Sequence, residues 1–233
     1  MCIYKMGVNQ VHINVLYEDN HLLIVEKPVN VPVQGDSSKD KDLLTILKEY
    51  IKEKYNKPGD VYLGLVHRLD RPVGGAMVFA RTSKAASRLA DELRKHQIYR
   101  KYLAVTRGHL QKDSGRLTDY LKKDRSKNVV SVVKQSEKDA QKAVLDYQVL
   151  KNNDTGSLVE VDLQTGRSHQ IRVQLSNQGA PLYGDQKYGQ HVNKPGQQIA
   201  LWASRLSVKH PTKKEWITVD CPPPDKHPWS VFI

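Results

Sequence analysis

The residue most able to take part in a chemical reaction is Asp70, in a segment that runs HRLDRPVGG from His67. An arginine lies two positions before this aspartate and another follows it directly. Nearby cations favour the charged form of a carboxyl group, so we expect Asp70 to be ionised at neutral pH and able to act as a nucleophile or a base. Gly74 and Gly75 would allow a tight turn and the close approach of a substrate. An aspartate that only caps a turn and pairs with surface arginines would give the same local pattern.

A second segment, residues 165–175, reads TGRSHQIRVQL. Its pattern predicts a helix with Ser168 as the N-cap, with Ile171 and the leucine four positions later on one apolar face, and with Gly179 at the C-terminal cap. Such a helix would hold Arg172 at a fixed position, and its first free N–H groups would attract an anion such as phosphate. An ordinary amphipathic helix with a solvated arginine is the alternative interpretation.

Together these segments resemble the RluA-type pseudouridine synthases, which convert uridine in RNA to pseudouridine. That family carries an HRLD motif with the catalytic aspartate, a K-x-Y motif with an active-site tyrosine, and a G-R-x-H-Q-x-R helix with a buried arginine. The matching segments here are His67–Asp70, Arg100–Tyr102 and Gly166–Arg172, in the same order. Leu22–Pro28 is similar to the family's K-P opening, and Tyr183–Asp185 is similar to its later G-D segment.

The resemblance covers roughly residues 12–210 and departs from the family at two places. The family usually has Thr-Ser after the aspartate motif, where this chain has Val73 and Gly74. Hydroxyl hydrogen bonds that would support the aspartate's loop must therefore come from other groups. The first residue of K-x-Y is Arg100 here, and Tyr99 adds an aromatic ring beside it.

The resemblance implies roles for three residues. Asp70 would serve the reaction either by attacking the sugar or by removing a C2′ proton to give a glycal-like intermediate, and the sequence does not choose between these routes. Arg172 would pair with Asp70 and keep it ionised and oriented. Tyr102 would stack on the uracil and help to remove the C5 proton, although a strand tyrosine in the core has the same local pattern.

The target base must leave its stack to reach the aspartate. Arg68 is long and planar enough to fill the vacated space, as its counterpart in the family is thought to do, although a surface salt bridge would also suit it. Ile171 could give the uracil an apolar contact, which helix packing explains as well. His67 and Arg167 belong to the same two motifs, and we group them with the residues that contact RNA and flip the base.

The charge balance agrees with a polyanionic partner. The chain has 37 Lys and Arg against 25 Asp and Glu in 233 residues, a net charge of +12. Residues 81–127 alone hold 14 basic and 5 acidic side chains. Attraction to phosphates and counterion release make RNA, either rRNA or tRNA, the expected partner. A basic surface that only keeps the protein soluble is the alternative.

Several classes of protein are disfavoured by what the sequence lacks. Two cysteines, Cys2 and Cys221, cannot form a disulfide framework or a zinc motif. Neither phosphate-loop nor metal-ligand spacing is present, and the isomerisation needs no electrons, so we expect no cofactor and no metal. We also expect no membrane segment, since no apolar run approaches about 18 residues. The cytoplasm is the resulting expectation. We also expect a monomer, since one flipped base needs one active site, and the family resemblance implies no N-terminal S4 domain.

The pattern of apolar residues predicts an α+β fold, with a mixed and largely antiparallel central sheet and flanking helices. The family resemblance places the active site across the middle of that sheet. We expect residues 1–11 to be a lead-in and residues 12–233 to form one catalytic domain. The expected strands are 12–17, 22–26, 76–80, 99–106, 129–133, 142–150, 157–164, 199–208 and 216–219; the expected helices are 43–55, 82–93 and 168–178; and 113–127 is expected to be a charged excursion.

Two other functions fit parts of the sequence. A basic RNA-binding protein without catalysis would explain the charge, but would leave Asp70, Tyr102 and Arg172 without a purpose. A nucleosidase or glycosidase using one aspartate is the other, although glycosidases normally use a pair of carboxylates. The acid nearest to Asp70 in the preceding sequence is Asp60, in a Pro-Gly turn.

Overall fold

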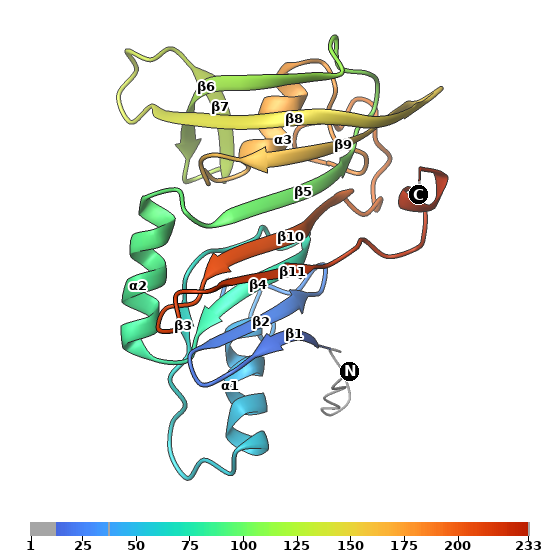
Figure 1. Cartoon of the computed structure of the whole chain (residues 1–233). Helices are drawn as coiled ribbons and strands as arrows, with labels where there is room; N and C mark the ends of the chain where they lie inside the picture. The colour runs from blue at the N-terminus through green and yellow to red at the C-terminus, as the bar shows by residue number, and fades with distance from the viewer. Residues whose placement is uncertain (1–12, 37, 233) are drawn as a thin grey trace. The chain divides into compact units, whose positions relative to one another are not determined.

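The structure is a computed structural model that describes residues 13–36 and 38–232 (Figure 1). The expected lead-in at residues 1–11 lies outside the described residues. The chain divides into two compact units, one of Met1–Tyr99 with Ala203–Pro222 and the other of Arg100–Trp202 with Pro223–Ile233. The prediction of one catalytic domain over residues 12–233 stays a prediction.

The first unit is built on an antiparallel set of strands. Its strands are β1 (Asn14–Glu18), β2 (Leu22–Lys27), β3 (Gly64–Leu65), β4 (Gly74–Ala80), most of β10 (Leu201–Lys209) and β11 (Trp216–Asp220). They follow the order β1-β2-β4-β10-β11, and β3 also pairs with β4. Almost every residue of β2 and all of β4 are buried, because these two strands lie inside the sheet and carry near-continuous apolar runs.

Two helices accompany these strands in the first unit. They are α1 (Leu43–Lys54) and α2 (Ser83–Arg94). Each begins where a short polar side chain satisfies a free backbone N–H: Asp42 accepts from Thr45, and Thr82 accepts from Ala85. Both caps agree with the helix starts that the sequence predicts.

The second unit contains five strands and a short helix. They are β5 (Tyr99–Val105), β6 (Ser114–Asp124), β7 (Val129–Val133), β8 (Gln141–Asn153), β9 (Gly156–Leu163) and α3 (Gln170–Asn177), and a 3₁₀ turn follows at Trp229–Val231. The strand order is β5-β9-β8-β6-β7, and these pairs are antiparallel. Val173 of α3 packs with Leu121, Val130 and Ala143 of the sheet, which fixes the helix against its strands.

The predicted α+β class with a largely antiparallel sheet is confirmed. The charged excursion predicted for residues 113–127 is wrong, because most of it forms β6, an 11-residue strand. β6 is hydrogen-bonded to β7 on one side and β8 on the other, so its backbone polar groups have partners. Three of its five charged side chains stand at its C-terminal end, and Arg116 makes two hydrogen bonds across the ladder to Asp146, at 2.7 and 2.8 Å. Pairing on both edges therefore outweighs the polar composition of this segment.

Candidate active site

Asp70 lies in the loop that connects β3 to β4, and the side chain of Lys27 fixes this loop. The Lys27 side chain is fully buried. Its Nζ donates hydrogen bonds to the carbonyls of Pro28 at 2.8 Å, Arg71 at 3.0 Å and Val73 at 2.7 Å. One ammonium group thus holds the backbone on the C-terminal side of Asp70 at two points.

Further hydrogen bonds complete the turn around Asp70. The Val73 N–H donates to the Asp70 carbonyl at 2.9 Å, and the Asn30 N–H donates to the Arg71 carbonyl at 2.9 Å. These bonds, with those of Lys27, replace the hydroxyl support that Val73 and Gly74 cannot give. The Asp70 side chain is half-buried between the buried Leu69 and the half-buried Arg71. The loop is therefore held by its backbone, while Asp70 itself is only partly buried.

Electrostatics link Lys27 to the aspartate. Burial lowers the pKa of Lys27 to about 7, the negative charge of Asp70 acts to raise it, and the positive charge of Arg71 lowers it further. The ammonium of Lys27 therefore stands close enough to Asp70 to interact with its charge.

The other residues of the aspartate motif differ in exposure. His67 is buried, and its Nε2 accepts a hydrogen bond from the Val78 backbone N–H of β4 at 3.2 Å. This contact anchors the start of the loop, whereas the RNA contact expected of His67 stays a prediction. Arg68 is exposed. The Arg71 guanidinium donates to the Asn30 carbonyl and pairs with Asp36 and Asp40.

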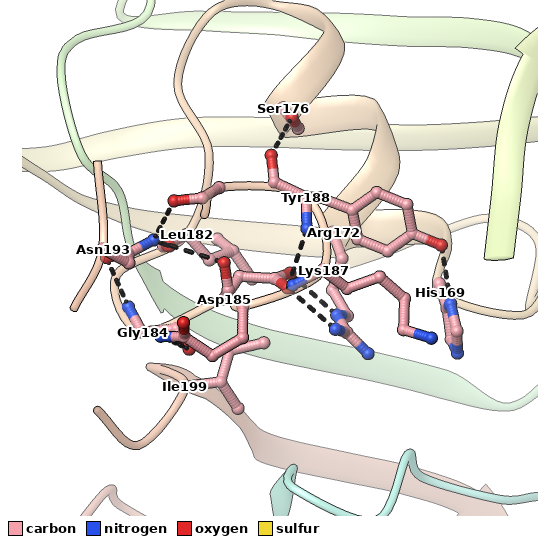
Figure 2. A network of polar contacts seen from close by, with 12 residues as sticks. His169, Arg172, Ser176, Leu182, Gly184, Asp185, Lys187, Tyr188, Asn193 and Ile199 are labelled. Carbon is pink, nitrogen blue, oxygen red and sulfur yellow. Dashed lines mark hydrogen bonds and ion pairs between the residues drawn. The ribbon is translucent and has the colours of Figure 1, made fainter. Parts of the chain in front are cut away.

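The second unit presents Arg172 from α3 in a network drawn in Figure 2. Its Nε and Nη2 donate to the two carboxylate oxygens of Asp185, both at 2.8 Å. Both side chains are buried, at 7% and 0% exposure. The guanidinium carbon also lies 5.2 Å from the centre of the Tyr188 ring. This bidentate pair fixes the plane of the Arg172 guanidinium.

Asp185 has the bonds that a buried carboxylate needs. Its Oδ1 also accepts from the backbone N–H groups of Lys187 and Tyr188, at 2.9 and 3.2 Å (Figure 2). Burial acts to raise the pKa of Asp185, but the hydrogen bond and charge of Arg172 with these N–H groups outweigh it and lower the pKa. Asp185 is therefore held as an anion, which keeps Arg172 charged and oriented.

The start of α3 differs from the prediction that Ser168 is its N-cap. The N-cap is His169, in the left-handed conformation at φ 51°, and no side chain caps the helix there. The Nδ1 of His169 instead lies 2.7 Å from the Tyr188 hydroxyl. The Gln170 side chain ties the approach to the helix, since its Oε1 accepts from the Thr165 hydroxyl and the Arg167 N–H at 2.8 and 3.0 Å.

The end of α3 confirms the prediction at Gly179. This glycine has φ +77°. The N–H groups of Gly179 and Ala180 donate to the carbonyls of Ser176 and Leu175, which is the Schellman pattern.

The remaining predicted residues of the second unit lie on β5, on α3 and in the segment just before α3. Tyr102 is buried on β5, opposite Val161 of β9. Ile171 is buried on α3. Arg167 is exposed, and its Nε donates to the Lys142 carbonyl at 3.0 Å. Tyr102 therefore lies in the interior of the second unit, and Arg167 lies on its surface.

The predicted site residues belong to two different units. His67, Arg68 and Asp70 belong to the first, while Tyr102, Arg167, Ile171 and Arg172 belong to the second. The pairing of Asp70 with Arg172 therefore stays a prediction.

Sequence reasoning missed two residues of these networks, Lys27 and Asp185. Both lie in segments that resemble family motifs, the K-P opening and the G-D segment. The sequence therefore pointed to these segments but indicated no role for either residue. Within residues 13–36 and 38–232, no group of three or more His, Cys, Asp or Glu side chains could hold a metal ion. None of the helices described is long and apolar enough to cross a membrane.

Comparison with known proteins agrees with this arrangement of motifs on an α+β fold. Residues 21–177 match the family model of RNA pseudouridylate synthases. The RNA pseudouridine synthase YhcT of Bacillus subtilis (strain 168), whose name marks it as uncharacterized, is 34% identical over 215 residues, which cover 91% of this chain and 69% of that protein. The ribosomal large subunit pseudouridine synthase D of Xanthomonas campestris is 32% identical over 229 residues, covering 91% of this chain and 66% of that protein.

A solved structure supports the fold and the same class of protein. Human RNA pseudouridylate synthase domain containing 4 is 25% identical with a TM-score of 0.76, covering 91% of this chain and 88% of that one. The chain belongs to the RluA-type family of RNA pseudouridine synthases. It is an isomerase that acts on RNA, as the sequence motifs predict.

Proposed function

We propose that this protein converts specific uridines of ribosomal or transfer RNA to pseudouridine, with Asp70 as its catalytic carboxylate. The observation that carries the proposal is the fixed turn around Asp70. Lys27 bonds three carbonyls of this region, while the residue Asp70 is half-buried. Rigid backbone and an accessible carboxylate are what a reacting group needs to meet a substrate at one geometry.

The reaction rearranges bonds without net change in composition. The N1–C1′ bond breaks, the uracil turns, C5 joins C1′, and C5 loses a proton while N1 gains one. Asp70 serves either by forming a bond to C1′ or by taking the C2′ proton. Both routes need an ionised carboxylate and an exit for the C5 proton.

Arg172 and Tyr102 complete the proposed chemistry. Arg172 pairs with Asp70 and keeps it ionised and oriented, while Asp185 sets the orientation of the arginine. Support comes from the bidentate geometry, which uses Nε and Nη2. Tyr102 stacks on the uracil and helps to remove the C5 proton.

Base flipping is the proposed way in which the uridine reaches Asp70. Arg68 enters the vacated space in the RNA, which its exposure supports. Ile171 gives the uracil an apolar contact, while Arg167 and His67 contribute to the RNA-facing part of the motifs. Arg167 is exposed, whereas His67 is buried and acts by holding the loop.

Large-subunit ribosomal RNA is the first substrate to test, because four of the relatives are named for the ribosomal large subunit. Tritium release from [5-³H]uridine-labelled rRNA and tRNA measures C5 substitution directly. We expect release by the wild type and a loss of about 10²–10⁴-fold in Asp70→Asn. Asp60→Asn is the matched control, since Asp60 is an exposed aspartate upstream of the loop.

Each rival function gives a different result in this experiment. Near-full turnover by Asp70→Asn would show that this aspartate is not the catalyst. Free uracil in the products would indicate a nucleosidase. RNA binding by both proteins without tritium release from any RNA would favour a binding protein.

A further inference from the structure

Two large aromatic side chains contact each other on the surface of the first unit. Tyr99 is 52% exposed and Trp216 is 50% exposed. Their ring centres are 5.3 Å apart, with the planes tilted by 40°. Single exposed hydrophobic residues are common, but two exposed rings in contact make an apolar patch that suggests a binding surface.

The strands place both rings on a solvent-facing side. Trp216 opens β11 opposite Lys209 of β10, and along β11 the exposed residues alternate with more covered ones. On β5, Tyr99 is exposed while the residues on either side of it are buried. Tyr102 lies three positions further along β5, which places its side chain on the opposite side of that strand. The patch is therefore separate from the tyrosine of the candidate active site.

Several lysines lie near the two rings, and the acidic side chain beside Trp216, Glu215, pairs with Lys213 at 3.5 Å. The turn before Tyr99 exposes Lys95, and the turn before Trp216 exposes Lys214. Lys209 is half-buried beside Trp216 in the ladder. Lys95, Lys209 and Lys214 make no ion pair with any residue that the structure describes. Their charges therefore remain available to an anionic ligand.

Arg88 ties α2 to the turn between β10 and β11. Its Nη1 donates to the Pro211 carbonyl at 2.6 Å. Since α2 leads into the turn before Tyr99, this bond and the ring contact hold both aromatic side chains on one framework. A stacking surface needs rings that are already positioned.

We propose that Tyr99 and Trp216 form a second RNA-binding site, on which an unpaired base of the RNA stacks while Lys95, Lys209 and Lys214 contact the adjacent phosphates. Exposed aromatic rings beside basic side chains are how sequence-tolerant proteins bind single-stranded nucleic acid. Lysine is depleted in the cores of protein–protein interfaces, so the charges favour RNA over a protein partner. The proposal rests on RNA being the substrate and extends its contacts beyond the reacting uridine.

Tryptophan fluorescence gives a direct test. Of the three tryptophans, Trp202 and Trp229 are 5% and 4% exposed, so a stacked base quenches chiefly Trp216. The probe is single-stranded oligoadenylate, which contains no uridine and therefore cannot be a substrate. We expect it to quench wild type and Asp70→Asn alike, with a loss of quenching in Trp216→Phe. This result is independent of whether Asp70 is the catalyst.

Binding and turnover of variants provide the second measurement. We expect Trp216→Ala and Tyr99→Ala to weaken oligoadenylate binding on the order of tenfold, and to raise the KM for rRNA while kcat stays unchanged. Tyr62→Ala is the control, because Tyr62 is also 50% exposed and has no ring contact within the described chain. Lys209→Gln with Lys214→Gln should reduce the salt dependence of the same binding.

Three results would overturn the proposal. The first is unchanged fluorescence in wild type at saturating oligoadenylate. The second is equal binding by Trp216→Phe, Trp216→Ala and wild type, where the phenylalanine variant keeps most of the apolar volume if the alanine variant folds poorly. The third is an equal loss in Tyr62→Ala, which would point to general surface effects.

Discussion

Lys27 shows how a buried charge can serve the loop that carries Asp70. Three carbonyls accept its Nζ hydrogen bonds, and an ammonium has three N–H groups to give. Burial nevertheless lowers the pKa of this side chain to about 7, so the folded protein releases near neutrality a proton that the unfolded chain keeps up to about pH 10.5. Protonation and loop anchoring are therefore coupled at this residue.

The sign of that coupling gives a prediction for the stability of Lys27→Met. Between about pH 7 and pH 10.5 the unfolded chain binds more protons than the folded protein at this site, so the Lys27 contribution to the free energy of unfolding rises with pH. Below about pH 7 both states are protonated and this contribution is constant. We expect the free energy of unfolding of wild type, relative to that of Lys27→Met, to rise by at most about 1.4 kcal/mol per pH unit in that window.

Urea unfolding at a series of pH values measures this difference. Lys57→Met is the matched control, because Lys57 is exposed. A difference between wild type and Lys27→Met that stays flat from pH 7 to pH 10 would contradict the prediction.

At the scale of elements, the loop of Asp70 ends where β4 approaches β10 very closely. Gly75 has φ +114°, and a Cβ added there would lie 2.4 Å from the Ala203 carbonyl oxygen and 2.5 Å from its nitrogen. The contacted atoms are backbone, so a side chain can be accommodated only if the strands move apart. Gly75→Ala should therefore destabilise the protein by about 3 kcal/mol or more.

Comparison with Gly179→Ala separates the effect of this close approach on stability from the effect of backbone strain alone. Gly179 also has a positive φ, +77°, but a Cβ there would meet nothing within 4 Å. Its replacement should cost about 1 kcal/mol. Midpoints of urea unfolding for the two variants give the comparison, and equal midpoints would show that the contact with Ala203 does not limit the fold.

The elements that sequence predicts well are those whose local pattern agrees with their place in the sheet. The apolar runs of β2 and β4, the alternation of β9, and the starts of α1 and α2 all appear where expected. β6 was missed, because its partners on both edges, not its own composition, make it a strand. The start of α3 was missed, since a left-handed His169 and the Gln170 side chain take the place of a serine cap.

The residues of the candidate site also fall into two groups, those that motifs predicted and those that support them. Motif identity and spacing predicted Asp70, Tyr102 and Arg172 as its residues. The supports could not be assigned from sequence, because Lys27 bonds carbonyls 44 and 46 residues away and Asp185 binds an arginine 13 residues before it. Such contacts depend on which strands and loops become neighbours.

At the scale of the whole molecule, where the net charge is +12, several cations of the basic segment, residues 81–127, are neutralised locally by ion pairs. Five cations of residues 81–127 are ion-paired: Arg81 with Glu18, Arg94 with Asp91, Lys101 with Glu160, Arg116 with Asp146, and Lys122 with Glu137. The segment spans α2, β5 and β6, which belong to both units. Lys123 and Lys127, which form no ion pair within the part of the chain that the structure describes, are therefore better candidates for phosphate contacts than the ion-paired cations.

This distinction predicts which lysines set the salt dependence of RNA binding. The logarithm of the binding constant should fall linearly with the logarithm of salt concentration, with a slope near 0.7 for each phosphate contact to a single strand. Lys123→Gln with Lys127→Gln should lower that slope by about 0.7 for each phosphate that the variant no longer binds. Lys52→Gln with Lys57→Gln removes the same charge from exposed lysines of α1 and the turn after it. Because those lysines lie outside the basic segment, the slope should stay that of wild type, and equal slopes for both double variants would mean that net charge alone governs binding.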